Sequence, residues 1–203
     1  MFLELNAYTH RGRNAFETGE ISNTRLFLPT NFHRARASAA EISLELRQLE
    51  RIGLSGRFQY AVARVHFFGP VSGGFPSEKL EPGERILPAF DQTHTGTAGI
   101  FYRNPWQNFW SGFIFRYGSG TPVEEKIEAH GEEIRRIGRL AQHLTADFAA
   151  GVTLWQKESR RLDFEFNLTN LSDNIYRISK ESETTPIQFS PRRVVSGRLT
   201  LHF

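Results

Sequence analysis

VSGRLTLHF, residues 195–203, decides the fold. From Val195 to Phe203 every second residue is apolar or glycine, and Ser, Arg, Thr and His stand between them. Successive side chains of a β-strand point to opposite faces of the sheet, so this alternation predicts a strand with one apolar and one polar face. Other strands are therefore expected wherever the same alternation recurs in the chain.

The same alternation recurs at several earlier places. It is clear at residues 41–47, 144–154 and 162–168, and weaker at residues 3–9, 56–67, 95–103 and 108–117. The weaker segments are rich in the aromatic and β-branched residues that favour a pleated surface. Together with the final segment, the sequence therefore predicts eight strands and an all-β fold.

The predicted connections fall into two populations that alternate along the chain. Short ones lie at residues 48–54, 104–107 and 157–160, and long ones at residues 10–33, 68–92, 118–142 and 172–190. If antiparallel neighbours are joined in order, all the short turns emerge at one end of the sheet and all the long loops at the other. Outer-membrane barrels have this asymmetry, with short periplasmic turns and long extracellular loops.

Two architectures are consistent with the alternation. A water-soluble sandwich would bury the apolar face as its core, and a barrel in lipid would turn that face outward and line its interior with the polar face. The loop asymmetry and the aromatic content of 13% favour an antiparallel, up-and-down transmembrane β-barrel segment. The expected lipid-facing residues are Ile42, Leu44, Leu46, Phe148, Val152, Leu154, Leu162, Phe164, Phe166 and Leu168. The expected lumen-facing residues are Glu41, Glu45, Arg47, Asp163, Glu165 and Arg198.

Composition excludes several other classes. The chain has 203 residues, 25 basic and 22 acidic side chains and no cysteine. The absence of cysteine rules out disulfides, thiolate metal sites and cysteine nucleophiles. Basic and acidic residues are interspersed, which argues against nucleic acid as a partner. We expect no signal peptide, since no basic and apolar leader is present, and no apolar stretch has the length of a transmembrane helix.

No motif for catalysis or cofactor binding stands out. His130 lies among Glu128, Glu132 and Glu133, but without the HExxH spacing, and a solvated charge cluster in a long loop is the favoured interpretation. Apolar residues at roughly helical spacing in residues 123–144 are consistent with a short loop helix or a flexible cap. No GxSxG nucleophile motif is present. We therefore expect no catalytic, metal or cofactor site.

Four stretches of the sequence carry a family resemblance. PRRVVSGRLTLHF, residues 191–203, resembles the terminal strand of bacterial outer-membrane proteins, whose aromatic last residue helps the barrel-assembly machinery recognise the chain. LTNLSDNIYRIS, residues 168–179, resembles the penultimate-strand motif of TonB-dependent outer-membrane receptors. Residues 81–103 and 116–124 are similar to the segments of these receptors that flank a short periplasmic turn. The resemblance assigns an assembly signal to Val195, Leu199, Leu201 and Phe203, and family-motif positions to Asn170, Leu171, Asp173 and Tyr176.

The resemblance implies a role in energised uptake of scarce ligands, such as iron-siderophore complexes or cobalamin, across the bacterial outer membrane. Family members carry a plug domain and a TonB-contacting box, which have no counterpart here, and their barrels have about 22 strands. Residues 1–203 are therefore expected to be the C-terminal portion of a receptor barrel. Its expected partners are outer-membrane lipid, the missing plug and N-terminal strands, the barrel-assembly machinery and, through the plug only, TonB.

Two alternatives remain open at this stage. One is an autonomous eight-stranded outer-membrane barrel, acting as a lipid-modifying enzyme or an adhesion module, because small barrels of this size exist. The other is a soluble β-sandwich that binds a small apolar ligand.

Overall fold

The computed structural model describes residues 1–20, 27–72, 82–88, 90–129, 132–179 and 186–203. Within these ranges the fold is all-β, with antiparallel strands and no helix. None of the described residues therefore belongs to a helix with the length and apolar character needed to cross a membrane. The expected all-β, antiparallel class is confirmed.

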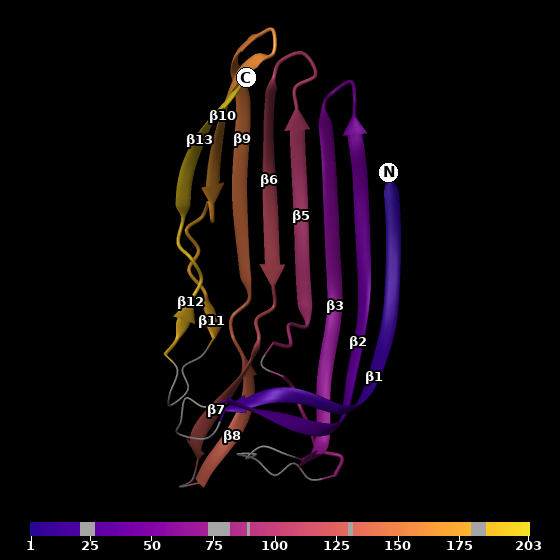
Figure 1. Ribbon diagram of the computed structural model, residues 1–203. Coiled ribbons are helices and arrows are strands. Elements are labelled where there is room, and N and C mark those ends of the chain that lie inside the picture. The colour runs from indigo at the N-terminus through magenta and orange to yellow at the C-terminus, as the bar shows by residue number, and fades with distance from the viewer. Residues whose placement is uncertain (21–26, 73–81, 89, 130–131, 180–185) are drawn as a thin grey trace.

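One large sheet organises the molecule (Figure 1). Its strands follow one another in sequence order, each antiparallel to the next: β1 (Phe2–Glu20), β2 (Phe27–Leu49), β3 (Leu54–Ser72), β5 (His94–Arg103), β6 (Phe109–Gly118), β9 (His143–Lys157), β10 (Arg160–Thr169) and β13 (Val194–His202). A short strand, β4 (Arg85–Ile86), pairs with β3. These eight principal strands correspond to the eight predicted segments.

The sheet is open. Strands β1 and β13 lie at its opposite edges (Figure 1), and neither edge pairs with a further strand among the described residues. The described strands therefore form no closed barrel, whereas the alternative of an autonomous eight-stranded barrel requires β1 to pair with β13. The three short connections do lie where the sequence predicts them, because β2 ends at Leu49 before β3 begins, β5 ends at Arg103, and β9 ends at Lys157.

The first predicted long loop is largely strand, which corrects the prediction for residues 10–33. β1 and β2 continue as a paired hairpin as far as Glu20 and Phe27. The prediction relied on alternating hydrophobicity, and in this part of the hairpin arginines occupy positions that apolar residues hold closer to residue 1. Main-chain pairing continues although the hydrophobic signal is lost.

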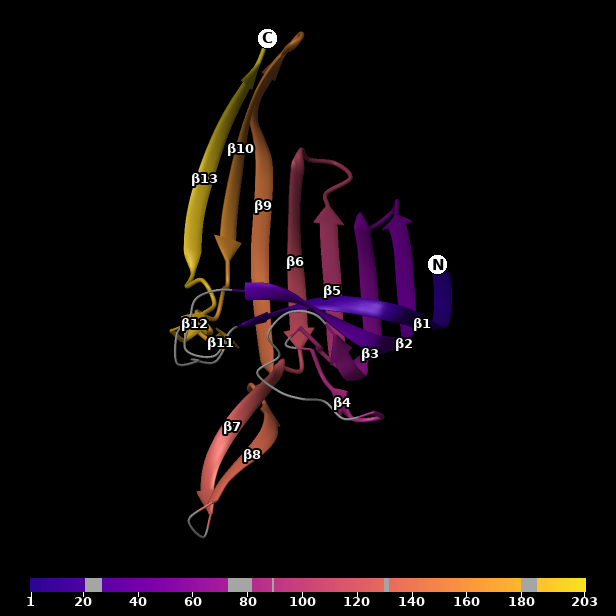
Figure 2. The same cartoon turned by 60° about the horizontal axis from the view of Figure 1, so that its bottom comes forward.

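The interpretation of residues 123–144 as containing a short loop helix is also wrong. Strands β7 (Pro122–Ala129) and β8 (Glu132–Arg139) form a hairpin instead, and Figure 2 shows it projecting from the loop end of the main sheet. Ile127 and Ile134 are directly opposite each other in this hairpin. Positions that mirror each other across a turn can have the same sequence spacing as two turns of helix, and this explains the misleading pattern. A second small pair is formed by β11 (Arg177–Ser179) and β12 (Gln188–Phe189).

The principal sheet has no apolar core of ordinary size. Only four hydrophobic residues are buried among those the structure describes, and two of them, Phe32 and Phe67, stack on each other with ring centroids 4.9 Å apart. The accessible surface is 14680 Å², whereas a compact monomer of this mass would expose about 9,700 Å². Phe164 and Leu199, which a sandwich would cover, are 36% and 65% exposed. The principal strands therefore do not form a two-layered soluble sandwich.

Candidate functional site

The principal sheet has one continuous apolar face. Residues directly opposite each other in neighbouring antiparallel strands share a face, so the register can be followed from strand to strand. Leu44 is opposite Phe58, Phe58 is opposite Ala98, and the series continues through β6 and β9 to β13. We call this surface the apolar face. Of the predicted lipid-facing residues, it carries Ile42, Leu44, Leu46, Phe148, Val152, Leu162, Phe164, Phe166 and Leu168.

Leu154 is placed differently from the other predicted lipid-facing residues. The register between β9 and β10 shifts at Leu162 and Asp163, so that Leu162 is opposite Trp155 and Asp163 is opposite Thr153. Leu154 is consequently the extra residue of a β-bulge and has no partner on β10. A single inserted residue changes which later side chains lie on each face, which hydrophobic alternation read from one strand does not reveal.

The terminal strand continues the apolar face to the edge of the sheet. Val195 is opposite Leu168, Leu199 is opposite Phe164, and Leu201 is opposite Leu162. Phe203 follows the last residue of β13 and is exposed. The proposed assembly-signal residues of this strand thus lie at an edge that pairs with no further strand among the described residues.

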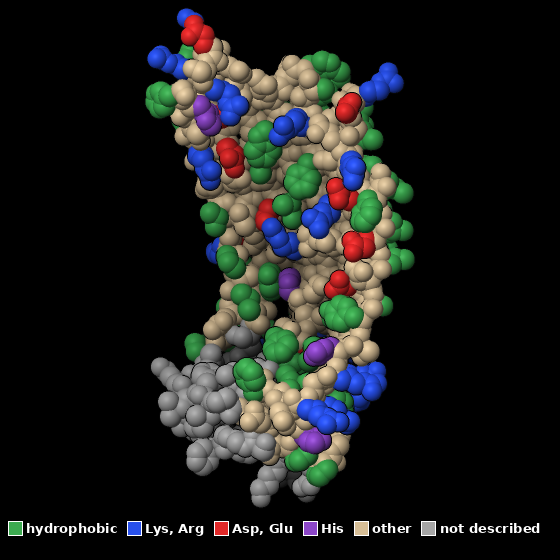
Figure 3. All heavy atoms as spheres, turned by 45° about the vertical axis from the view of Figure 1, so that its right-hand side comes forward, with side chains coloured by type: hydrophobic (Ala, Val, Ile, Leu, Met, Phe, Trp, Pro, Cys, Tyr) green, Lys and Arg blue, Asp and Glu red, His purple; other side chains and the backbone are tan. Residues whose placement is uncertain are grey.

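The opposite surface, which we call the polar face, carries ionisable side chains in cross-strand pairs. Glu45 is opposite Arg57, and Glu165 is opposite Arg198. Figure 3 shows acidic and basic side chains over the middle of the visible face, while hydrophobic side chains project from its right-hand edge. The polar face includes the predicted lumen-facing residues Glu41, Glu45, Asp163, Glu165 and Arg198, and Arg47 lies just beyond the last regular pair of β2 and β3.

Hydrogen bonds tie the polar face together across strands. Thr153 Oγ1 donates to Asp163 Oδ1 at 2.8 Å, and Arg161 forms an ion pair with the same carboxylate, with Nε and Oδ2 2.8 Å apart. Arg116 forms a second ion pair, through its Nη1 atom, with Oδ2 of Asp147. These carboxylates have partners, so the polar face is an ordered hydrogen-bonding surface and suits contact with water or with another polar surface.

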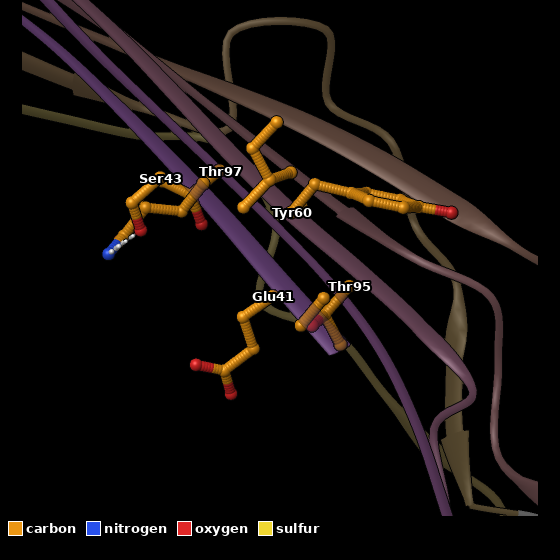
Figure 4. A pocket seen from close by; sticks show the side chains of 9 residues that line it. Glu41, Ser43, Tyr60, Thr95 and Thr97 are labelled. Carbon is orange, nitrogen blue, oxygen red and sulfur yellow. Dashed lines mark hydrogen bonds between the residues drawn. The ribbon is translucent and has the colours of Figure 1, made fainter. Parts of the chain in front are cut away.

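A shallow hollow of about 240 Å³ lies on the polar face between β2, β3 and β5. Figure 4 shows Glu41, Ser43, Thr95 and Thr97 around it, with the Tyr60 side chain directed away on the other side of the sheet. Gln59 Nε2 donates to Ser43 Oγ at 3.4 Å. The hollow offers one carboxylate and several hydroxyl groups, so it is suited to hydrogen bonding with a polar surface.

The family-motif residues organise the exit from β10. The Asn170 side chain is buried at the join, where its Nδ2 donates to the carbonyl oxygens of Asn174 and Pro191, each at 3.0 Å, and its Oδ1 accepts from the Asn174 N–H at 3.0 Å. Its own N–H donates to Asp147 Oδ1 at 2.9 Å. With φ of 53°, Asn170 has a left-handed backbone, which asparagine tolerates better than most residues.

The other motif residues hold the same connection. The Leu171 N–H donates to the Ala146 carbonyl at 2.6 Å, and Asp173 Oδ1 accepts from the Arg193 N–H at 2.8 Å. The Tyr176 ring stacks on His143, with centroids 3.8 Å apart. The motif therefore anchors the chain after β10 against the loop end of β9 and guides it toward β13. Sequence reasoning located these residues but gave no structural role for them.

An ion pair at the loop end, between the buried carboxylate of Asp91 and the partly exposed Arg139, was missed by sequence reasoning. Asp91 Oδ2 lies 2.6 Å from Arg139 Nη2, and its Oδ1 accepts from the Val65 N–H at 2.8 Å. Arg139 Nη1 also donates to the carbonyl oxygens of Asp91 and Gly120, at 2.9 and 3.2 Å. This cluster, Asp91 with Arg139, fastens the base of the β7–β8 hairpin to β3. The signal in the sequence was a lone Asp in an apolar stretch before a strand.

The motif segment at residues 116–124 begins with RYGSG, and the structure explains its last glycine, Gly120. Its φ is 81°, and a Cβ atom there would meet the Leu140 carbonyl oxygen at 2.0 Å. Only glycine combines that backbone with this close approach. The Ser119 N–H donates to the His94 carbonyl at 3.0 Å, so the described parts of the two motif segments, residues 81–103 and 116–124, meet at the loop end.

The metal hypothesis falls partly outside the described residues, because His130 is not among them. In the part of the chain that the structure describes, no group of three or more His, Cys, Asp or Glu residues is arranged to hold a metal ion. Glu132 and Glu133 lie on β8, where they are opposite Ala129 and Glu128 of β7.

The chain matches no protein-family model, and comparison with curated proteins finds no match.

Proposed function

We propose that this chain forms part of the wall of a transmembrane β-barrel in the bacterial outer membrane, and that the barrel is a TonB-dependent receptor. Such a receptor would take up scarce ligands, such as iron-siderophore complexes or cobalamin, without catalysing a reaction. The observation that carries the proposal is the apolar face, which continues across all eight principal strands and lies opposite a charged face.

Lipid is the environment that suits these two faces. An exposed aromatic and aliphatic surface of this extent is unfavourable in water, but outward-facing apolar bands are the rule in outer-membrane barrels. On β9 the apolar positions run from Leu144 to Val152, which matches the roughly 9 to 11 residues that a tilted strand needs to cross the hydrocarbon. The polar face would then line a wet lumen and meet a plug domain.

The open edges favour a larger barrel. Unpaired backbone groups in lipid cost several kcal/mol each, so β1 and β13 both need strand partners. Additional strands, as in a barrel of about 22, would supply them. The barrel-assembly machinery would recognise the terminal strand, and TonB would act through the plug. These partners, like the ligand class, follow from the resemblance of the quoted motifs.

Surface labelling in intact cells tests the proposed topology. We expect cysteine at Ser172, in the long connection after β10, to react with a membrane-impermeant maleimide. We expect cysteine at Arg51, in the short turn between β2 and β3, to react only after the cells are opened. The chain has no native cysteine, so each variant carries a single reactive thiol. Equal labelling at both positions in intact cells would contradict the proposal.

A crosslinking experiment distinguishes part of a receptor wall from an autonomous barrel of eight strands. In a small closed barrel β1 would pair with β13, so cysteines at Glu4 and Arg198 would be joined by a short bifunctional crosslinker. In a larger barrel, other strands stand between these two edges. We expect no intramolecular crosslink, while a control pair at Glu165 and Arg198, which are opposite each other, reacts efficiently. Efficient crosslinking of the first pair would favour the autonomous barrel.

A further inference from the structure

Along β1, β2 and β3 the apolar face changes character toward the loop end. Nearer the short-turn end of the sheet, the cross-strand pairs on this face are apolar, as with Leu5 opposite Ile42. Toward the loop end, the next cross-strand pair of β1 and β2 consists of alanines, and the pair after it carries hydroxyl groups. These are Thr9 and Ser38, whose Oγ atoms are 3.0 Å apart. From the level of Thr9 and Ser38 onward the same face becomes basic: Arg64 is opposite Ser38, and further toward the loop end the face carries Arg11, Arg13, Arg34, Arg36 and Arg85, together with His66. We call the six arginines and His66 the basic cluster.

The arginines of the basic cluster are aligned in a way that an isolated sheet would not favour. Arg11 is directly opposite Arg36, and Arg13 is directly opposite Arg34. Like charges at directly opposed positions destabilise a sheet. All six arginines are exposed, and none of them forms an ion pair with a carboxylate whose side chain the structure describes. Arg34 has an aromatic contact, since its guanidinium lies 5.0 Å from the centre of the Phe68 ring.

His66 lies among these arginines on β3, directly opposite Arg36 of β2. Arg64, two residues earlier on the same strand and face, is directly opposite Ser38. An anion placed among these arginines would neutralise charge that no described side chain neutralises.

We propose that the basic cluster binds the phosphate groups of a phosphorylated membrane lipid in the outer leaflet. This inference rests on the proposed function, because it takes the apolar face to be in contact with lipid. On the same face, hydrocarbon contacts give way to hydroxyl groups and then to arginines, which is the order in which acyl chains, linkage oxygens and phosphates succeed one another in a lipid. Guanidinium groups bind phosphate oxygens with paired hydrogen bonds.

Binding of lipid A to the full chain in detergent micelles, followed by native mass spectrometry, tests the inference. We expect bis-phosphorylated lipid A to bind, and the double variant Arg11→Gln, Arg36→Gln to bind it about 30-fold more weakly, because two charges near the phosphates are lost. The charge-retaining variant Arg11→Lys, Arg36→Lys is expected to keep most of the affinity. Both changes are at exposed positions, so the fold is expected to survive them.

The matched control removes two arginines from the polar face, with Arg57→Gln and Arg198→Gln. Both side chains are exposed, so the change in net charge is the same. An equal loss of affinity in the control, or equal binding of dephosphorylated lipid A, would overturn the inference. Displacement of lipid A by inorganic phosphate at similar concentrations would show a site for free anions instead. If the surface labelling described above holds and lipid A binding fails, only this inference is wrong.

Discussion

Arg at position 166 is expected to destabilise the membrane-inserted protein by roughly 2 to 4 kcal/mol, while Arg at position 167 is tolerated. Phe166 lies on the apolar face, opposite Ala150 and Gly197, in the middle of β10. An arginine there would place a charge in hydrocarbon, near the midplane of the bilayer. Asn167 is the adjacent residue and lies on the polar face, opposite Ala149 and Ser196. Its replacement would place the same charge in water.

Guanidinium-induced unfolding from phosphocholine vesicles, followed by tryptophan fluorescence, measures both free energies. Asn167 is a better control than Glu165, because an arginine at position 165 would stand directly opposite Arg198. Equal destabilisation at positions 166 and 167 would show that the two faces of the sheet are in similar environments. It would remove the basis for assigning the apolar face to lipid.

Asp91→Ala is expected to destabilise the loop end by about 3 kcal/mol. The Asp91 side chain is 2% exposed and partners both Arg139 and the Val65 N–H. Its removal would leave a partly buried guanidinium without its carboxylate and a backbone donor without an acceptor. Hydrogen exchange of the Val65 amide measures the effect, and we expect the rate to rise about 100-fold.

Asp91→Asn provides the matched variant. The asparagine oxygen can still accept from the Val65 N–H, but the charge that faces Arg139 is lost. We therefore expect an intermediate increase in exchange. The amides at the short-turn end of β3 are far along the strand from Asp91 and are expected to exchange as before. A uniform increase along β3 would indicate global destabilisation and contradict a local fastening role for the ion pair.

The sequence predicted the principal strands well because each of them is two-faced. Strict alternation at residues 162–168 and 195–203 reflects contact of alternate side chains with different environments, and this property is local to each strand. The short turns could be predicted equally well from the sequence, because they interrupt the alternation. What alternation cannot reveal is the β-bulge at Leu154, because its effect on the register depends on the pairing with β10.

The loop end was predicted less well for a physical reason. Beyond residue 9 the β1–β2 hairpin carries arginines on both strands of the same face, so pairing is no longer accompanied by a hydrophobic signal. The Asp91–Arg139 pair joins residues far apart in sequence, and neither residue is unusual by itself. The motif residues Asn170 and Asp173 were identified by resemblance, but their role in anchoring the β10–β13 connection comes from hydrogen bonds that only the fold reveals.

The central claim is that hydrocarbon contacts the apolar face and water contacts the polar face. A spin-label scan along β10 tests it most directly, with single cysteines from Leu162 to Leu168 in the membrane-inserted protein. Our account predicts that collision with oxygen, which concentrates in lipid, peaks at positions 162, 164, 166 and 168, while collision with a water-soluble nickel complex peaks at positions 163, 165 and 167. Accessibilities that do not alternate, or that alternate in the opposite phase, would contradict it.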